Sequence, residues 1–278
     1  MSYHVKMRFP EGRDRALTFS YDDGVKQDIR LVEILNKYGM KGTFNLNSGQ
    51  YKPEGEESKN RRMTEKQITE LFAGGPHEVA CHAYTHPSLA EMPASFATYE
   101  MIKDREALEV QFGTIVRGMA YPNGSVSDEV VELLKACGIV YARTTVSTEK
   151  FNLPTDWLRL PATCHHNNPR LMELAEKFVT MKVKHHPQLF YLWGHTYEFD
   201  DNENWNVIEA FTEYMSGKEE TIWYATNIEI FEYIEDYKRL IFSVDGTVVK
   251  NPTARTLWFA LNGKTVSVEA GETKRLDV

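Results

Sequence analysis

The 278-residue chain is poor in cysteine, with only Cys81, Cys137 and Cys164 and no CxxC pair. Three thiols cannot all pair with one another, so a disulfide framework is excluded. We expect three buried free thiols, as is usual for a protein of a reducing compartment.

Long apolar runs are also missing. No stretch of about 20 apolar residues occurs, so we expect no membrane span. The segment Met1–Pro10 carries charges and no apolar run typical of a signal peptide, which favours a cytoplasmic location, although a chain whose leader has been removed would look the same.

The chain has no excess of basic residues. Lys and Arg total 32 against 40 Asp and Glu, which gives a net charge of 32 − 40 = −8. A nucleic-acid partner needs a basic footprint, so we expect none. Internal repeats and low-complexity linkers are absent as well, and nothing in the sequence indicates an oligomeric state.

What the sequence does contain is an alternation of short apolar runs with helical patterns. The expected strands are Arg15–Tyr21, Gly42–Leu46, Val79–Cys81, Val116–Tyr121, Ile139–Thr144, Leu189–Trp193 and Thr221–Tyr224. The expected helices are Asp28–Tyr38, Thr64–Phe72, Ser95–Phe112, Asp128–Cys137, Pro169–Met181, Trp205–Ser216 and Asn227–Tyr237. Such alternation predicts an α/β fold with a mainly parallel sheet, and so many units favour a barrel whose active site lies at the C-terminal edge of the strands.

The pattern changes after about residue 240. Four short segments there alternate with a period of two, and Asp245-Gly246 and Asn262-Gly263 are typical hairpin turns. We therefore predict a catalytic domain over residues 1–239 and a small β appendage over residues 240–278.

The first residues with chemical potential are Asp22, Asp23 and Gly24, directly after the first expected strand. Two adjacent carboxylates at a strand end can point in different directions, and the glycine permits a tight turn. Paired acids before glycine are also common in ordinary turns, so this motif alone does not distinguish a functional site from a turn.

A second motif, His82-Ala83-Tyr84-Thr85-His86-Pro87, follows another expected strand. Two histidines four residues apart can converge on one ion if the segment turns helically. Because surface histidines recur by chance, the motif is weak by itself, and its position at a strand end strengthens it.

Further candidates come later in the chain: Arg117, Tyr121, Asp156-Trp157 and His195. Each has an ordinary alternative explanation, such as a surface ion pair, a helix cap beside a core tryptophan, or a core histidine. Together they place acids, histidines and an arginine on or just beyond several strands, a combination that chance explains poorly.

The order Asp-Asp-Gly, HxxxHP, RxxxYP, DW and strand-then-His resembles the five motifs of the polysaccharide deacetylases, the NodB-homology proteins of carbohydrate esterase family 4. The similarity extends over roughly Arg15 to Tyr197. It implies a distorted (β/α) barrel of about seven strands, and a metal-dependent hydrolase that removes an acetyl group from an N- or O-acetylated carbohydrate.

The resemblance also implies roles for the first half of the site. Asp23, His82 and His86 match the metal ligands, usually for Zn²⁺, and leave positions open for water and substrate. Asp22 matches the base that takes a proton from the activated water. Arg117 resembles the arginine that holds this base ionised.

In the second half, His195 matches the general acid, and Asp156 resembles the carboxylate that keeps it charged. The backbone N–H of Tyr121 is expected to stabilise the oxyanion. Trp157 resembles a wall of the acyl pocket, and Trp193 and Tyr197 are the other substrate-binding candidates.

The chain departs from the family pattern at several positions. Ala83 stands where a hydroxyl residue commonly braces the loop after the first histidine, and Thr85 is the candidate substitute. Trp193 replaces a smaller aliphatic residue, which would narrow the acyl pocket or offer a platform for a sugar. The arginine motif has one residue more between Arg117 and Tyr121 than its tightest form.

Two other groups have competing interpretations. The run Cys164-His165-His166 offers ligands for a second metal, but adjacent side chains of an extended segment point apart, so we favour a substrate-side loop. The acidic loop Asp200-Asp201 would attract a cationic amino sugar or would simply be solvated.

Three functions remain open. The first is the carbohydrate deacetylase, the second is a hydrolase of another C–N bond such as a small amide, and the third is a non-catalytic glycan- or metal-binding protein. A pure binder needs no base and acid together, which counts against the third. Without a leader sequence, we expect the substrate to be a soluble carbohydrate or small amide.

Overall fold

The computed structural model describes residues 5–56, 61–183 and 186–277, and its centre is a parallel sheet. The strand order is β7-β6-β5-β4-β3-β2-β9-β8, and β10 pairs with β2 beside the start of β3. The bounds of these strands are β2 Arg15–Asp22, β3 Gly42–Leu46, β4 Glu78–Cys81, β5 Gly118–Ala120, β6 Tyr141–Ser147, β7 Leu160–Ala162, β8 Cys164–His165, β9 Gln188–Gly194 and β10 Ile222–Tyr224. The predicted α/β class with a mainly parallel sheet is confirmed.

One short segment closes the sheet on itself. Residues 160–165 pair with β6 through β7 and with β9 through β8, all in parallel. The N–H of Thr163, between the two strands, donates to the carbonyl of Tyr191 over 2.9 Å. The two edges of the sheet thus share one connecting segment, which gives the barrel character that the alternation predicted.

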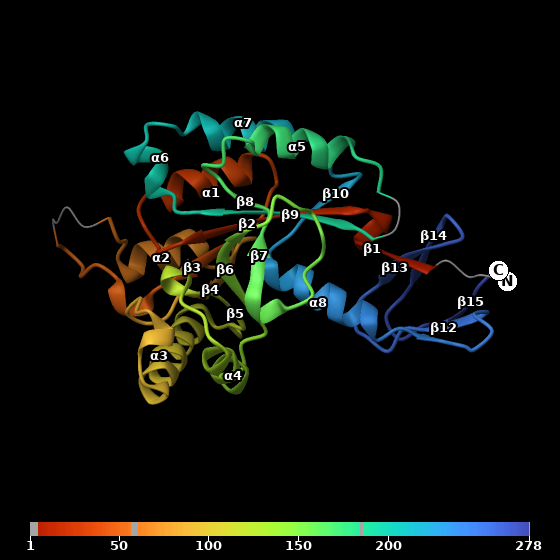
Figure 1. The fold of residues 1–278 in the computed structure, drawn as a ribbon, viewed down its shortest axis with the longest axis horizontal. Coiled ribbons are helices and arrows are strands. Elements are labelled where there is room, and N and C mark those ends of the chain that lie inside the picture. The colour runs from red at the N-terminus through yellow and green to blue at the C-terminus, as the bar shows by residue number, and fades with distance from the viewer. Residues whose placement is uncertain (1–4, 57–60, 184–185, 278) are drawn as a thin grey trace.

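Helices cover the sheet on both sides (Figure 1). Helices α1, α5 and α7 lie together along one side, and α2, α3 and α4 lie along the other. Their bounds are α1 Asp28–Lys37, α2 Glu65–Phe72, α3 Ala94–Phe112, α4 Asp128–Ala136, α5 Leu171–Thr180 and α7 Asn206–Met215. A short helix of five residues, α6 Tyr197–Asp201, precedes α7 and was not predicted.

Local sequence explains several of these boundaries. Thr64 and Gln67 form a reciprocal capping box at the start of α2, as predicted. Every residue of β2 is buried, in keeping with a central parallel strand covered on both faces. Gly39 takes a φ of 62° just after α1, a conformation that costs glycine little and ends the helix.

The last helix, α8 Asn227–Lys238, begins among the strands. A capping box of Thr226 and Glu229 starts it. The backbone N–H of Asn227 donates to Thr43 Oγ1 over 3.0 Å, and its side chain binds Thr18 and Tyr191. Side chains of β2, β3 and β9 therefore fix the start of α8.

The appendage forms two small antiparallel sheets, β1-β13-β14 and β11-β12-β15. Their bounds are β1 Val5–Arg8, β11 Ile241–Phe242, β12 Val248–Lys250, β13 Leu257–Leu261, β14 Lys264–Val268 and β15 Thr273–Arg275. Strand β1 was not predicted, and its pairing with β13 places residues 5–8 in the sheet of the C-terminal appendage. The two sheets lie at one end of the barrel, beyond α8 (Figure 1).

Cys81, Cys137 and Cys164 are all buried free thiols, as expected. Among the helices of the described ranges, none has the length and apolar character needed to cross a bilayer.

Candidate metal and catalytic site

Asp23, His82 and His86 converge at the C-terminal edge of the sheet. Asp23 follows β2 and the histidines follow β4, two strands that lie on either side of β3. One ligand atom from each residue lies within 4.8 Å of the other two. The Nε2 atom of His86 is 3.7 Å from Asp23 Oδ1, and the two imidazole rings are 4.8 Å apart. A carboxylate and two imidazoles at this spacing suit a divalent cation such as Zn²⁺.

The hydrogen bonding of His82 fits a metal ligand. Its Nδ1 atom lies 2.8 Å from the carbonyl of Ala120, so Nδ1 carries the proton and the lone pair of Nε2 faces the two aspartates. Burial lowers the pKa of this histidine to about 4 in the metal-free protein, which keeps the ring neutral as a ligand must be.

The loops that carry these ligands hold an unusual backbone conformation. Asp23, Ala83 and His86 have φ values of 89°, 59° and 62°, a region that non-glycine residues rarely adopt. Thr85 braces the histidine loop, because its backbone N–H and its hydroxyl donate to the two carboxylate oxygens of Glu100 over 2.7 and 2.8 Å. Thr85 thus supplies a brace where Ala83 lacks a hydroxyl.

Arg62 was not predicted, yet it binds the Asp23 ligand. It donates to the backbone carbonyl of Asp23 and, over 3.1 Å, to the carboxylate oxygen Oδ1. It also donates to Gln50 Oε1 over 2.7 Å. No sequence signal marked it, because it follows a polar stretch that looks like any exposed loop.

Asp22 is buried beside the ligands. Its Oδ2 atom lies 3.8 Å from His82 Nε2 and 3.8 Å from His195 Nε2, and its Oδ1 atom accepts from Asn45 over 2.8 Å. Asp22 therefore lies between the predicted metal ligands and the predicted general acid.

The arginine that contacts Asp22 is Arg143 of β6, and the prediction of Arg117 was wrong. Arg143 is 1% exposed and donates from Nη2 to Asp22 Oδ2. Burial alone would raise the pKa of Asp22, but the charges of Arg143, His82 and His195 outweigh it and lower that pKa to about 2. Arg117 precedes β5 and lies 3.8 Å from Glu232 of α8, which is the ordinary ion pair considered as its alternative.

Glu198 is the acid that pairs with His195, and the prediction of Asp156 was wrong. The Nδ1 atom of His195 is 3.2 Å from Glu198 Oε1. Burial would lower the pKa of His195, but the hydrogen bond from Glu198 and the charges of Asp22 and Asp23 outweigh it and raise that pKa.

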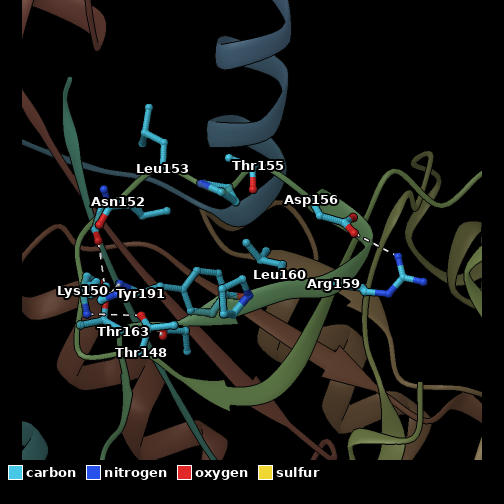
Figure 2. A pocket seen from close by; sticks show the side chains of 14 residues that line it. Thr148, Lys150, Asn152, Leu153, Thr155, Asp156, Arg159, Leu160, Thr163 and Tyr191 are labelled. Carbon is cyan, nitrogen blue, oxygen red and sulfur yellow. Dashed lines mark hydrogen bonds and ion pairs between the residues drawn. The ribbon is translucent and has the colours of Figure 1, made fainter. Parts of the chain in front are cut away.

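Asp156 lies instead at the rim of a separate cavity of about 460 Å³, formed by the 148–156 loop with β7 and β9 (Figure 2). There it caps the N–H of Leu158 over 3.0 Å and pairs with Arg159 at 3.0 Å. The helix-cap explanation, weighed against a catalytic one, is the correct one for this residue.

His165 and His166 also reach Glu198, although adjacent side chains were expected to diverge. Their Nε2 atoms lie 3.1 and 2.9 Å from Glu198 Oε2. Strand β8 ends at His165, so His166 leaves the alternating geometry of the strand and turns toward the same carboxylate. His165, His195 and Glu198 are the second group of the described residues whose ligand atoms are close enough for a metal ion.

Two other predicted roles do not fit the structure. The backbone N–H of Tyr121 donates to the carbonyl of Arg143 over 2.9 Å in the sheet ladder, so it is not available to an oxyanion. The ring of Trp157 packs edge-on against Phe231 of α8, with centroids 5.1 Å apart, and belongs to the apolar cluster around that helix. A sequence cannot reveal either fact without the strand register and the helix position.

Of the remaining substrate-binding candidates, only Tyr197 borders an open hollow. Trp193 is 8% exposed, with the Arg143 guanidinium 4.3 Å from its ring centre, so it supports that arginine and offers no exposed platform for a sugar. Tyr197 lines a hollow of about 430 Å³ together with Asp23, Arg61 and Arg62.

The acidic loop is largely paired. Asp201 binds the guanidinium of Arg61 through both oxygens, at 2.6 and 2.8 Å. Asp200 accepts from Trp205 and from Gln27, each over 2.7 Å. These contacts account for both carboxylates without a cationic sugar.

With this geometry established, the chain can be compared with known proteins. Residues 10–142 match the family model described as polysaccharide deacetylase. The matched segment covers just under half of the chain and is similar to the polysaccharide deacetylases. It carries Asp22, Asp23 and both histidine ligands, and it ends one residue before Arg143 and well before His195.

A curated relative, the uncharacterized protein YlxY of Bacillus subtilis (strain 168), is 26% identical over 125 residues. The matched part makes up 45% of this chain and 36% of the relative, so the chain spans about a third of that relative's length.

Solved structures of polysaccharide deacetylases and carbohydrate esterases share the fold. A putative polysaccharide deacetylase from Mycobacterium smegmatis is 17% identical, with 83% of this chain and 93% of that chain covered and a TM-score of 0.59. The Xyl-CE4 domain of a xylanase from the hindgut metagenome of Trinervitermes trinervoides is also 17% identical, with 80% and 92% covered and a TM-score of 0.52. A mutant of a CE4 family pseudoenzyme from Bacillus anthracis is 20% identical, with 80% and 69% covered and a TM-score of 0.50. At these identities the similarity shows the fold alone, and a protein described as a pseudoenzyme shares it, so activity must be argued from the site.

Proposed function

We propose that this chain is a metal-dependent hydrolase that removes an acetyl group from an N- or O-acetylated carbohydrate. The observation that carries the proposal is the position of Asp22, whose Oδ2 atom lies 3.8 Å from a metal-ligand nitrogen on one side and 3.8 Å from His195 Nε2 on the other. A base, a ligand set and an acid thus meet at one edge of the sheet. A protein that only binds glycans has no need for this combination.

The ligand set consists of Asp23, His82 and His86. A divalent cation held there would polarise the attacking water and the substrate carbonyl. Arg62, which lies shortly before α2, donates to the Asp23 carboxylate and holds it in place.

The chain's own side chains would move the protons. Asp22 accepts a proton from the attacking water at its carboxylate, which Arg143 keeps ionised. His195 donates its Nε2 proton to the leaving oxygen or nitrogen, and its raised pKa favours the protonated ring that this step requires. Tyr197, at the edge of the hollow beside Asp23, is the candidate contact for the sugar.

Metal removal combined with acetate release tests this function. We expect the purified protein to release acetate from members of a panel of N- and O-acetylated mono- and oligosaccharides, to lose this activity on verified metal removal, and to regain it with Zn²⁺ or a similar ion. Full activity after metal removal would exclude the mechanism. Release of acetate from small amides alone would favour the other C–N hydrolase.

Two variants distinguish the proposed base from the proposed metal ligands. Asp22→Asn should reduce turnover by about 100-fold or more while the metal content stays near that of the parent, because the base is not a ligand. His82→Ala should lose the metal. An active Asp22→Asn protein would show that the roles are assigned wrongly.

A further inference from the structure

The carboxylate of Glu198 is surrounded by three imidazoles. Its Oε1 atom lies 3.2 Å from His195 Nδ1, and its Oε2 atom lies 3.1 Å from His165 Nε2 and 2.9 Å from His166 Nε2. The side-chain amide of Asn167 donates to the same Oε2 atom over 3.3 Å. Four nitrogen atoms thus converge on one carboxylate that contacts the predicted acid His195.

The contact with Glu198 fixes how the His195 ring faces the cleft. A carboxylate beside Nδ1 makes that nitrogen the donor, and the turn from His195 into α6 brings Glu198, three residues later, back to it. The Nε2 atom then faces Asp22 at 3.8 Å. This is the nitrogen that must carry the transferable proton.

The bonding of His165 favours a proton, not a metal ion, between it and Glu198. The backbone N–H of Asn167 donates to His165 Nδ1 over 3.1 Å, so in the neutral ring the proton sits on Nε2 and points at Glu198. A histidine that binds a metal almost always donates from its other nitrogen, and here that nitrogen is an acceptor. The second group of possible metal ligands is therefore better explained as a hydrogen-bonded cluster.

His166 holds the carboxylate from the buried side. Its side chain is fully buried, and its ring stacks on Phe199 with centroids 4.1 Å apart. A Cβ atom at Gly194 would lie 2.1 Å from His166 Nδ1, so any side chain at this position of β9 would clash with the ring. Burial lowers the pKa of His166 to about 4, so the ring is a neutral neighbour of Glu198.

We propose that Glu198 is a positioning residue: its contact with Nδ1 of His195 turns Nε2 of that ring toward Asp22. Three neighbours keep Glu198 in place as a carboxylate: His165, His166 and Asn167. The mechanistic meaning of this arrangement rests on the proposed hydrolase function, in which His195 is the acid. Glu198, three residues after His195, thus has the role that the sequence predicted for Asp156.

The charges around His195 support this role. Glu198 faces it from α6, Asp22 and Asp23 face it from the end of β2, and the neutral rings of Trp193 and Tyr197 lie beside it. Burial would raise the pKa of Glu198, but the bonds from the three histidines outweigh it and hold that pKa well below its usual range. Glu198 thus stays ionised over the whole range in which His195 titrates.

Nitrogen-15 NMR of the imidazoles tests the proposal without any substrate. In the metal-free parent, we expect His195 to be the Nδ1–H tautomer when neutral and to titrate above the ordinary histidine range. In Glu198→Gln, which keeps the size of the side chain and removes its charge, the titration should move to lower pH. Glu209→Gln, the same change at an exposed glutamate of α7, should leave it unchanged.

The activity measurement is a pH profile of kcat/KM for acetate release. Glu198→Gln should move the alkaline limb to lower pH and reduce activity by about tenfold or more on that limb. A uniform loss at every pH would indicate a merely structural role and would contradict the proposal.

Three further outcomes also test the proposal. If Glu198→Gln does not fold, Glu198→Asp replaces it in the test. The aspartate side chain is one methylene shorter, so its carboxylate no longer reaches His195 in the same way. A His195 titration identical to the parent's would then overturn the proposal. A second equivalent of Zn²⁺ bound by the parent and lost in Glu198→Gln would replace the hydrogen-bonded cluster with a metal site. If the parent releases no acetate from any substrate while the NMR shift occurs, the proposed function fails and the positioning contact stands.

Discussion

At the scale of single residues, Asp22 and Arg143 form the most buried ion pair of the site, with side chains 3% and 1% exposed. A carboxylate in this position would be protonated by burial alone, so its ionisation depends on its neighbours. The arginine also packs against Trp193, which keeps the guanidinium level with the end of β2. The ionisation of Asp22 therefore depends on one side chain from a strand four places away in the sheet.

We predict that Arg143→Gln moves the acidic limb of the activity profile to higher pH, because Asp22 is then protonated more readily. Activity should fall by about tenfold or more at mildly acidic pH, and the free energy of unfolding by about 3–5 kcal/mol, since a buried charge loses its partner. The pH profile of acetate release and urea unfolding check the two effects. Arg117→Gln, at a partly exposed ion pair, is the matched control and should change neither.

Equal losses in the two variants would contradict the assignment of Arg143. If Arg143→Gln does not fold, Arg143→Lys tests the same point, since it keeps the charge and should keep the acidic limb near its parental position.

Sequence motifs located five of the side chains that meet here, because Asp22, Asp23, His82, His86 and His195 lie at the end of a recognisable strand or in the loop after it. Other partners were missed for a physical reason: their positions depend on register and on turns that no motif encodes.

Arg143 shows this most clearly. It pairs in register with Ala120, the last residue of β5, and so lies at the C-terminal edge of the sheet, whereas Arg117 precedes the first residue of β5. Glu198 reaches its histidine only because a helical turn follows β9.

At the scale of elements, α8 joins the barrel to the appendage. The hydroxyl of Tyr233 donates to the carbonyl of Arg8 over 2.7 Å and accepts from the N–H of Trp258 over 3.0 Å. These two residues are paired in register between β1 and β13, so one buried hydroxyl binds both strands. The appendage is thus fixed to the helix by a specific polar contact as well as by apolar packing.

Tyr233→Phe should lower the free energy of unfolding by about 1–3 kcal/mol, because it leaves a backbone donor and a backbone acceptor without their partner. Urea unfolding followed by circular dichroism measures the change. Tyr237→Phe, one turn later on α8, is the control: its hydroxyl has no hydrogen-bond partner within residues 5–56, 61–183 and 186–277, and its loss should cost little. A similar cost for both variants would show that packing alone holds the appendage.

The elements themselves followed from the sequence where they were long. Strand β2, helix α1 and helix α3 lie within two residues of their predicted bounds, and a glycine with positive φ follows each helix, Gly39 after α1 and Gly113 after α3. Strands β7 and β8 were missed because three and two residues carry no periodicity. Strand β1 is a strand only because β13, some 250 positions later, pairs with it.

At the scale of the whole molecule, six buried groups contribute opposing terms to the way stability depends on pH in the metal-free protein. Burial raises the pKa values of three carboxyl groups to about 7: those of Asp28, Glu78 and Asp104. Burial lowers the pKa values of three imidazoles to about 4: those of His77, His82 and His166.

Between about pH 4.5 and 6 these groups oppose one another. The folded state binds three protons on the acids and none on the histidines, and the unfolded state binds none on the acids and three on the histidines. At these six groups the two states then bind equal numbers of protons, so their combined contribution to the free energy of unfolding should be nearly constant in this window. It should fall as pH rises through 7, since the unfolded histidines lose their protons first while the buried acids must ionise.

Two single substitutions should give the free energy of unfolding slopes of opposite sign against pH in this window. Asp28→Asn removes one acid, so the unfolded state then binds one proton more than the folded state, and stability should rise with pH by about 1.4 kcal/mol per pH unit. His77→Gln removes one histidine and should make stability fall with pH at the same rate. Urea unfolding of the chelated proteins at pH 4.5, 5.25 and 6.0 measures both slopes, and the slopes stay informative whatever each substitution costs at a fixed pH. If the two slopes had the same sign, the opposing balance of buried acids and histidines would not be the origin of the nearly constant contribution.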